Sequence, residues 1–84
     1  MNVPVHVIAN FNPLGKIKPL YIWIEDEEQK INRYKIEKIE NIKEERYSGM
    51  DMLLFSCTVL TGDYMKQIFI RYTVETHKWM LVDN

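Results

Sequence analysis

The sequence has little of the chemistry on which metal proteins depend. Its 84 residues include one cysteine and two histidines, so no disulfide can form within the chain. The residues that a metal site would need are Cys57, His6 and His77, with Asp63 beside them. They show none of the ligand spacings typical of metal sites, such as Cys-x-x-Cys. We therefore expect no metal site and no cofactor.

Glycine is also scarce, and its placement excludes several catalytic motifs. The three glycines stand alone at positions 15, 49 and 62, so the chain has no glycine-rich phosphate loop and no nucleophile elbow. Cys57 lies in an apolar stripe, where a small buried hydrophobic side chain is the ordinary interpretation. The acidic run of residues 25–28 is typical of a solvated turn. We predict no catalytic residues and no enzymatic activity.

Strong charge of one sign and long apolar runs are absent as well. The formal net charge is −1, from 11 basic and 12 acidic residues, and no basic stripe marks a nucleic-acid binder. No stretch approaches the roughly 18 apolar residues of a membrane-spanning helix. The first ten residues lack the basic start of a signal peptide. We expect a cytoplasmic protein that does not interact with membranes.

The apolar residues that are present predict one small β domain over residues 1–84. Hydrophobic residues make up 46% of the chain and aromatic residues 12%, as in a folded globular domain. Residues 52–75 read as two strands joined at positions 61–64, because apolar residues recur at every second position. The predicted buried rows of this hairpin are Leu53, Phe55, Cys57 and Val59, and Ile68, Ile70, Tyr72 and Val74.

Two further strands are expected before this hairpin. Residues 2–11 alternate apolar and polar, and Pro4 places this strand at an edge of the sheet or at a strand start. In residues 16–25, Leu20, Ile22 and Ile24 share one face and Ile17, Tyr21 and Trp23 the other. Pro19 indicates an exposed edge or a bulge.

Residues 30–46 fit two interpretations. The isoleucines at 36, 39 and 42 recur every three residues, and the Glu and Lys content favours a helix. Alternatively, residues 32–42 form a strand with a bulge between Ile36 and Ile39, as the β-branched side chains favour. With a last strand at 79–82, the second interpretation gives a six-stranded antiparallel meander. A meander of this size hides its edges by closing into a small SH3-like barrel.

Short motifs along the chain follow the pattern of a known family. The matching residues are Gly15, Ile17, Pro19, Ile22, Trp23, Tyr34, Lys35, Ile36, Ile39, Lys78 and Trp79. In these residues the chain resembles an uncharacterised family of small bacterial proteins, common in clostridia. The resemblance covers most of the chain from Gly15 onward, although Leu54-Phe55-Ser56-Cys57 stands where many members have an Arg-Tyr-Thr-Val-like run. It implies an all-β, SH3-like barrel without catalytic residues, and a DNA-damage context, because some relatives are encoded near translesion-type DNA polymerases.

These features predict an interaction module that binds a protein partner, or a second copy of itself, through an edge strand or an aromatic patch. The alternatives are a nucleic-acid-associated barrel and a small-ligand-binding barrel. Most large rings must fill so small a core, and those left outside would form the binding surface. The candidate partner-binding residues are Tyr21, Trp23, Arg46, Tyr47 and Trp79.

Overall fold

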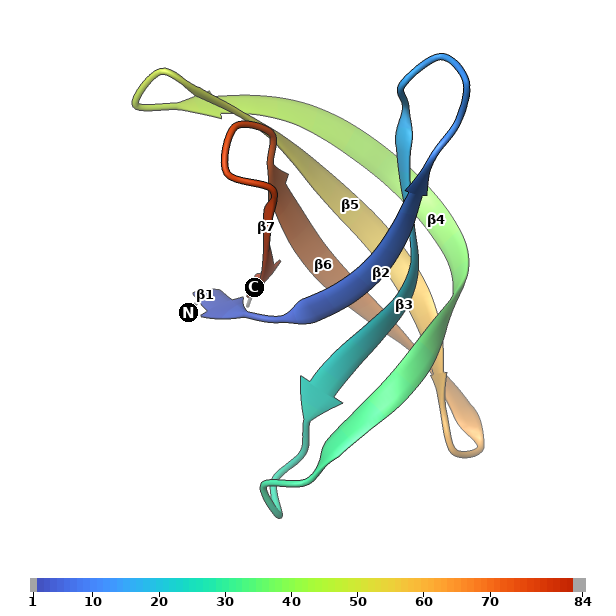
Figure 1. The fold of residues 1–84 in the computed structure, drawn as a ribbon. Helices are drawn as coiled ribbons and strands as arrows, with labels where there is room; N and C mark the ends of the chain where they lie inside the picture. Colours follow the sequence, from blue (N-terminus) through green and yellow to red (C-terminus); the bar gives the residue numbers. More distant parts are fainter. Residues whose placement is uncertain (1, 83–84) are drawn as a thin grey trace.

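The computed structural model describes residues 2–82, and all its regular elements are β-strands. They form one antiparallel sheet that curls into a half-barrel (Figure 1). No helix within residues 2–82 is long and apolar enough to cross a membrane. The strands are β1 (Asn2–Pro4), β2 (His6–Phe11), β3 (Ile17–Glu25), β4 (Ile31–Tyr47), β5 (Met50–Thr61), β6 (Tyr64–Thr73) and β7 (Lys78–Val82).

The sheet has seven strands where the sequence predicted six, because the expected strand over residues 2–11 changes partner in its middle. Residues 2–4 pair with β7, whereas residues 6–11 pair with β3. The change occurs at Val5, whose backbone N–H donates to the Trp79 carbonyl at 3.1 Å. β1 and β2 are therefore the two edge strands of the sheet, although they follow each other directly in the chain. The predicted all-β meander is confirmed, since β2 to β7 pair in sequence order.

Residues 30–46 form a strand and not a helix. β4 is the longest strand of the sheet and carries two register shifts against β5, which leave Glu37 and Glu40 without direct partners. Each extra residue moves the inward face by one position. The bulged strand therefore directs Ile36, Ile39 and Ile42 to the same face, which explains their three-residue spacing.

The core lies on the concave face of the sheet. Its fully buried centre comes from β3, β5 and β6, where Ile22, Phe55, Cys57, Val59 and Ile70 have no exposed surface. The predicted buried rows of β5 and β6 are confirmed except at Val74. That residue follows the end of β6 and is 41% exposed.

A bulge in β3 corrects the predicted faces of residues 16–25. Ile8 pairs with Tyr21 but Ala9 pairs with Pro19, so Leu20 is the extra residue. Ile17 consequently packs against the core, and Pro19 is fully buried. Pro19 thus marks a bulge in an inner strand of the sheet and not an exposed edge, while Pro4 does lie in an edge strand.

Candidate functional site

Aromatic and basic side chains gather on the outer face of β2, β3 and β4. His6 pairs with Trp23, which pairs with Arg33, and Ile8, Tyr21 and Lys35 form the next row. Directly paired residues project to the same side of a sheet. These six residues alternate with core residues such as Ile22 and form one surface. We call it the aromatic–basic face: His6, Ile8, Tyr21, Trp23, Arg33 and Lys35.

Ring contacts order this face. The imidazole of His6 stacks on the indole of Trp23 with centroids 4.1 Å apart and planes only 10° from parallel. The Arg33 guanidinium lies 5.2 Å from the centre of the Tyr21 ring. Contacts of these two kinds each contribute about 0.5–1.5 kcal/mol. They hold large, partly exposed rings in fixed orientations, which lowers the entropy lost when a partner binds.

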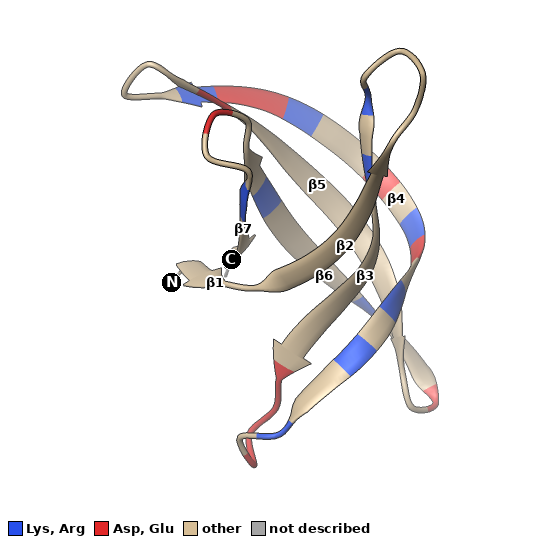
Figure 2. Ribbon diagram, in the orientation of Figure 1, with Lys and Arg blue, Asp and Glu red and all other residues tan. Residues whose placement is uncertain are grey.

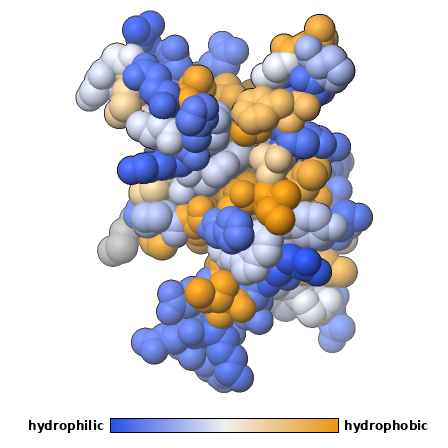
Figure 3. All heavy atoms as spheres, viewed as in Figure 1, coloured by the Kyte–Doolittle hydropathy of each residue, from blue (hydrophilic) through white to orange (hydrophobic). Residues whose placement is uncertain are grey.

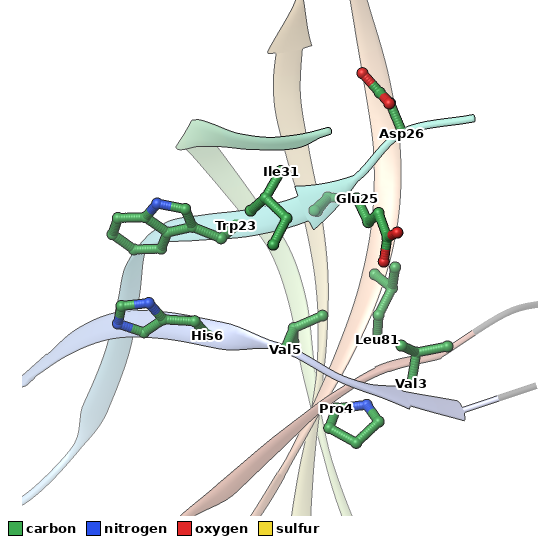
Figure 4. A pocket seen from close by; sticks show the side chains of 10 residues that line it. Val3, Pro4, Val5, His6, Trp23, Glu25, Asp26, Ile31 and Leu81 are labelled. Carbon is green, nitrogen blue, oxygen red and sulfur yellow. The ribbon is translucent and has the colours of Figure 1, made fainter. Parts of the chain in front are cut away.

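A cavity of about 530 Å³ adjoins this face at the point where the chain passes from β1 to β2. Figure 4 shows Trp23 and His6 side by side at one end of the cavity, with Ile31 and Val5 between them and Leu81. Ile31 is 67% exposed. The cavity is therefore an apolar hollow whose aromatic end is shared with the aromatic–basic face.

Acidic groups border the same cavity at its other end. The Glu25 carboxylate points toward Leu81, whereas the Asp26 carboxylate points away from the hollow (Figure 4). Asp26 has a structural role: its Oδ1 accepts hydrogen bonds from the backbone N–H groups of Glu28 and Lys30, both at 2.9 Å. The bond from Lys30 is the main reason that the pKa of Asp26 lies below its ordinary value. Within the predicted acidic turn, the Asp26 carboxylate therefore holds the backbone of the β3–β4 connection through hydrogen bonds.

The charges of this region are mixed. In Figure 2 the turn between β3 and β4 is red, and blue and red bands alternate along β4 beyond it. Arg33 and Lys35 thus follow closely on the acidic residues 25–28 in the chain. A partner that covers the aromatic–basic face and the cavity would meet cations over the strands and anions at the turn.

The five residues predicted to bind a partner do not form a single surface. Tyr21 and Trp23 lie together on the aromatic–basic face, while Arg46 and Tyr47 lie at the far end of β4. Trp79 packs on the concave side, with its ring 4.8 Å from that of Tyr72 and 5.6 Å from that of Phe55. The sequence did not identify His6, Arg33 and Lys35 as site residues. They occupy polar positions in alternating strands, and that alternation alone does not distinguish a binding residue from one that only faces solvent.

The residues examined as metal ligands are also separated. Cys57 is fully buried in the core, His6 stacks on Trp23, and the ring of His77 bonds to the Tyr72 hydroxyl. Burial raises the pKa of the Cys57 thiol to about 12, with a smaller contribution from the Glu40 charge. Across residues 2–82 no three His, Cys, Asp or Glu side chains are grouped so that they could hold a metal ion.

Comparison with known proteins adds no relative, since no family model, no curated protein and no solved structure matches the chain.

Proposed function

We propose that this protein is an interaction module that binds an extended segment of another protein through the aromatic–basic face and the adjoining cavity. The observation that carries the proposal is the position of Trp23, which belongs to both. Its ring forms the stack with His6 and lines the hollow beside Ile31. Partly exposed aromatic residues next to an apolar hollow are typical of binding hot spots.

The mixed charge favours a protein partner. A peptide can place an apolar side chain in the cavity, an acidic residue near Arg33 and Lys35, and a basic residue near Glu25. Charge complementarity of this kind sets the register and direction of a bound segment. A second copy of this chain is the alternative protein partner.

Single-stranded nucleic acid is the second candidate, favoured by one observation. Arg33 and Lys35 lie beside the rings of Tyr21 and Trp23, and such alternation of cations and rings is used to stack bases and track phosphates. The acidic turn at residues 25–28 opposes it, because phosphates would be repelled there.

We make a further proposal about the fold, the family and the cellular location of the protein. We propose that the half-barrel is a small SH3-like barrel, which is supported by the pairing of β1 with β7 and of β2 with β3. The resemblance to the clostridial family, an absence of enzymatic activity and a cytoplasmic location belong to the same proposal. The surface features that support it are those of a recognition domain.

A random peptide library displayed on phage would test the protein-binding proposal. We expect the protein to enrich peptides that have an acidic residue on one side of a large apolar residue and a basic residue on the other, and Trp23→Ala to weaken binding by tenfold or more. Tyr64→Ala is the matched control, because Tyr64 is 66% exposed and lies at the β5–β6 turn. It should bind the same peptides within about twofold.

Three results would count against binding of another protein. The first is a lack of enrichment, and the second is equal binding by the Trp23→Ala variant. The third is a concentration-dependent dimer, seen by sedimentation and lost in Trp23→Ala, which would identify a second copy as the partner. Binding of oligo(dT) that weakens steeply with salt would instead support the nucleic-acid candidate.

A further inference from the structure

A second cavity, of about 540 Å³, opens at the other end of the half-barrel. It is lined by residues of the β2–β3 hairpin and of the β6–β7 turn, which lie on opposite sides of the upper part of Figure 1. Phe55 and Tyr72 line it, and both are buried core residues. We call it the mouth cavity. It shares no lining residue with the cavity beside Trp23.

The rim of the mouth cavity is apolar and exposed. Phe11 is 60% exposed, Ile42 49% and Val74 41%, and each lines the cavity from a different strand or turn. Leu14, in the β2–β3 hairpin, is 83% exposed, and Figure 3 shows orange atoms at the upper right, where this hairpin ends. The inward-facing apolar side chains of the strands thus continue beyond the packed core as far as the mouth cavity. Within residues 2–82, no residue covers them there.

A few polar groups also face the mouth cavity. The Tyr72 hydroxyl and His77 Nδ1 are hydrogen-bonded at 2.7 Å. His77 has a φ of 58°, a left-handed conformation that is uncommon for residues other than glycine. Lys16 and Glu44 lie among the lining residues and carry opposite charges. The lining therefore has hydrogen-bonding groups, and its Lys and Glu side chains balance each other in charge.

From this arrangement we propose that the mouth cavity binds a small, uncharged and largely apolar molecule that carries one polar group. This site is separate from the proposed partner-binding surface. Its volume lies within the roughly 300–1,000 Å³ of small-molecule sites, and such sites combine an apolar lining with a few polar groups. An apolar body would contact Leu53 and Ile42, and the polar group would bond near Tyr72 and His77.

The charge balance decides between ligand classes. Lys16 and Glu44 both line the cavity, so its charged side chains include one cation and one anion with no excess of either sign. Bringing an ion into the apolar hollow costs free energy unless an opposite charge is available to pair with it. Lys16 and Glu44 balance each other in charge, so a neutral ligand needs no further charged group in the cavity.

Titration with N-phenyl-1-naphthylamine tests the proposal, since this probe is uncharged, has one N–H group and fluoresces in apolar surroundings. We expect a saturable rise in fluorescence with a stoichiometry of one. Ile42→Asp should weaken binding by about tenfold or more, because it replaces apolar lining with a charge. Leu60→Asp is the matched control: Leu60 is 45% exposed on β5 and does not line the cavity, so binding should stay within about twofold.

Competition experiments then define the ligand class. Decan-1-ol should displace the probe at concentrations about tenfold lower than decanoate or decylamine, because only the charged compounds lose ionic hydration. Far-UV circular dichroism and the thermal midpoint show that each variant is folded. Absence of saturable binding, equal binding by Ile42→Asp, or better displacement by a charged competitor overturns the proposal. Probe binding that decreases as a dimer forms would show instead that a second copy covers the mouth cavity.

Discussion

The Arg71 guanidinium donates a hydrogen bond from Nε to Glu45 Oε1 at 2.9 Å, although the two residues lie on strands separated by β5. Their side chains are only 17% and 7% exposed. The Tyr47 ring lies 5.4 Å from the same guanidinium. This ion pair therefore joins β4 to β6 across the outer face of β5, in the part of the sheet where Arg46 and Tyr47 lie.

Breaking this pair should destabilise the protein strongly. Arg71→Met leaves the Glu45 carboxylate nearly buried without its cation, and we expect a loss of about 3 kcal/mol in the free energy of unfolding. The double variant Glu45→Met with Arg71→Met should recover most of that loss, because neither charge then remains unpaired. Urea unfolding of the two single variants and the double variant measures the coupling.

An exposed ion pair nearby provides the comparison. Arg46 and Asp51 approach only to 3.9 Å, and their side chains are 70% and 64% exposed. Arg46→Ala should change the free energy of unfolding by less than about 0.5 kcal/mol, because solvent screens such pairs. Equal effects of Arg46→Ala and Arg71→Met would contradict the assignment of Arg71 as a buried cross-strand link.

The turns offer a second prediction, because Asn12 and Asp26 occupy equivalent positions. The Asn12 Oδ1 accepts from the N–H groups of Leu14 and Lys16, as the Asp26 Oδ1 accepts from the residues two and four positions later. The fourth residue of each turn has a positive φ, 80° at Gly15 and 65° at Gln29. Only the first of these turns has a glycine at that position.

Gln29→Gly should therefore stabilise the protein by about 0.5–1 kcal/mol, since a side chain in the left-handed region is strained. Gln67→Gly is the matched control on an exposed position within β6. It should destabilise by a similar amount, because glycine in a strand increases the entropy lost on folding. Chemical unfolding of both variants distinguishes these opposite signs, and a loss of stability in Gln29→Gly would refute the prediction.

The sequence predicted the strands well because each buried row repeats with a simple period. The isoleucines of β4 were harder, since a three-residue step fits a helix as well as a bulged strand. Their β-branched side chains favoured the strand, which the pairing of Ile36 with Val59 and of Ile39 with Cys57 confirms. Period alone did not locate the bulge at Leu20, because a bulge depends on the register of the neighbouring strand.

The candidate site was predictable only in part. Tyr21 and Trp23 were identified because residues two positions apart in a strand lie on the same face. The residues beside them, however, come from β2 and β4. Trp23 and Trp79 look alike in sequence, each within an apolar run. Only the closing of the sheet directs Trp79 toward Phe55 and Trp23 away from the core, and no local pattern contains that information.

This difference between the two tryptophans gives a third prediction. Trp79→Ala should reduce the free energy of unfolding by about 3 kcal/mol, because it leaves a cavity against Phe55 and Tyr72. Trp23→Ala should cost about 1 kcal/mol, mainly through loss of the stack with His6. Acrylamide quenching of Trp79→Phe and Trp23→Phe, each with one tryptophan, should show that Trp23 is the more accessible. The reverse order of quenching would contradict the proposed binding surface.

The last prediction concerns Cys57, which is fully buried and whose pKa is raised to about 12 by burial. The folded protein should react with Ellman's reagent only as fast as it unfolds, since the thiolate is the reactive form. Rapid reaction at pH 8 without denaturant would show that the thiol is accessible.

The same shift links stability to pH. Above pH 9 the thiol of the unfolded chain loses its proton, whereas the folded thiol keeps it until about pH 12. The folded state then binds more protons, so stability falls as pH rises. Between pH 8 and pH 10.5 this contribution amounts to about 2 kcal/mol. Because Lys and Tyr residues also titrate there, the measurement is the difference in pH slope between the wild type and Cys57→Ala. Equal slopes would show that Cys57 does not have the raised pKa.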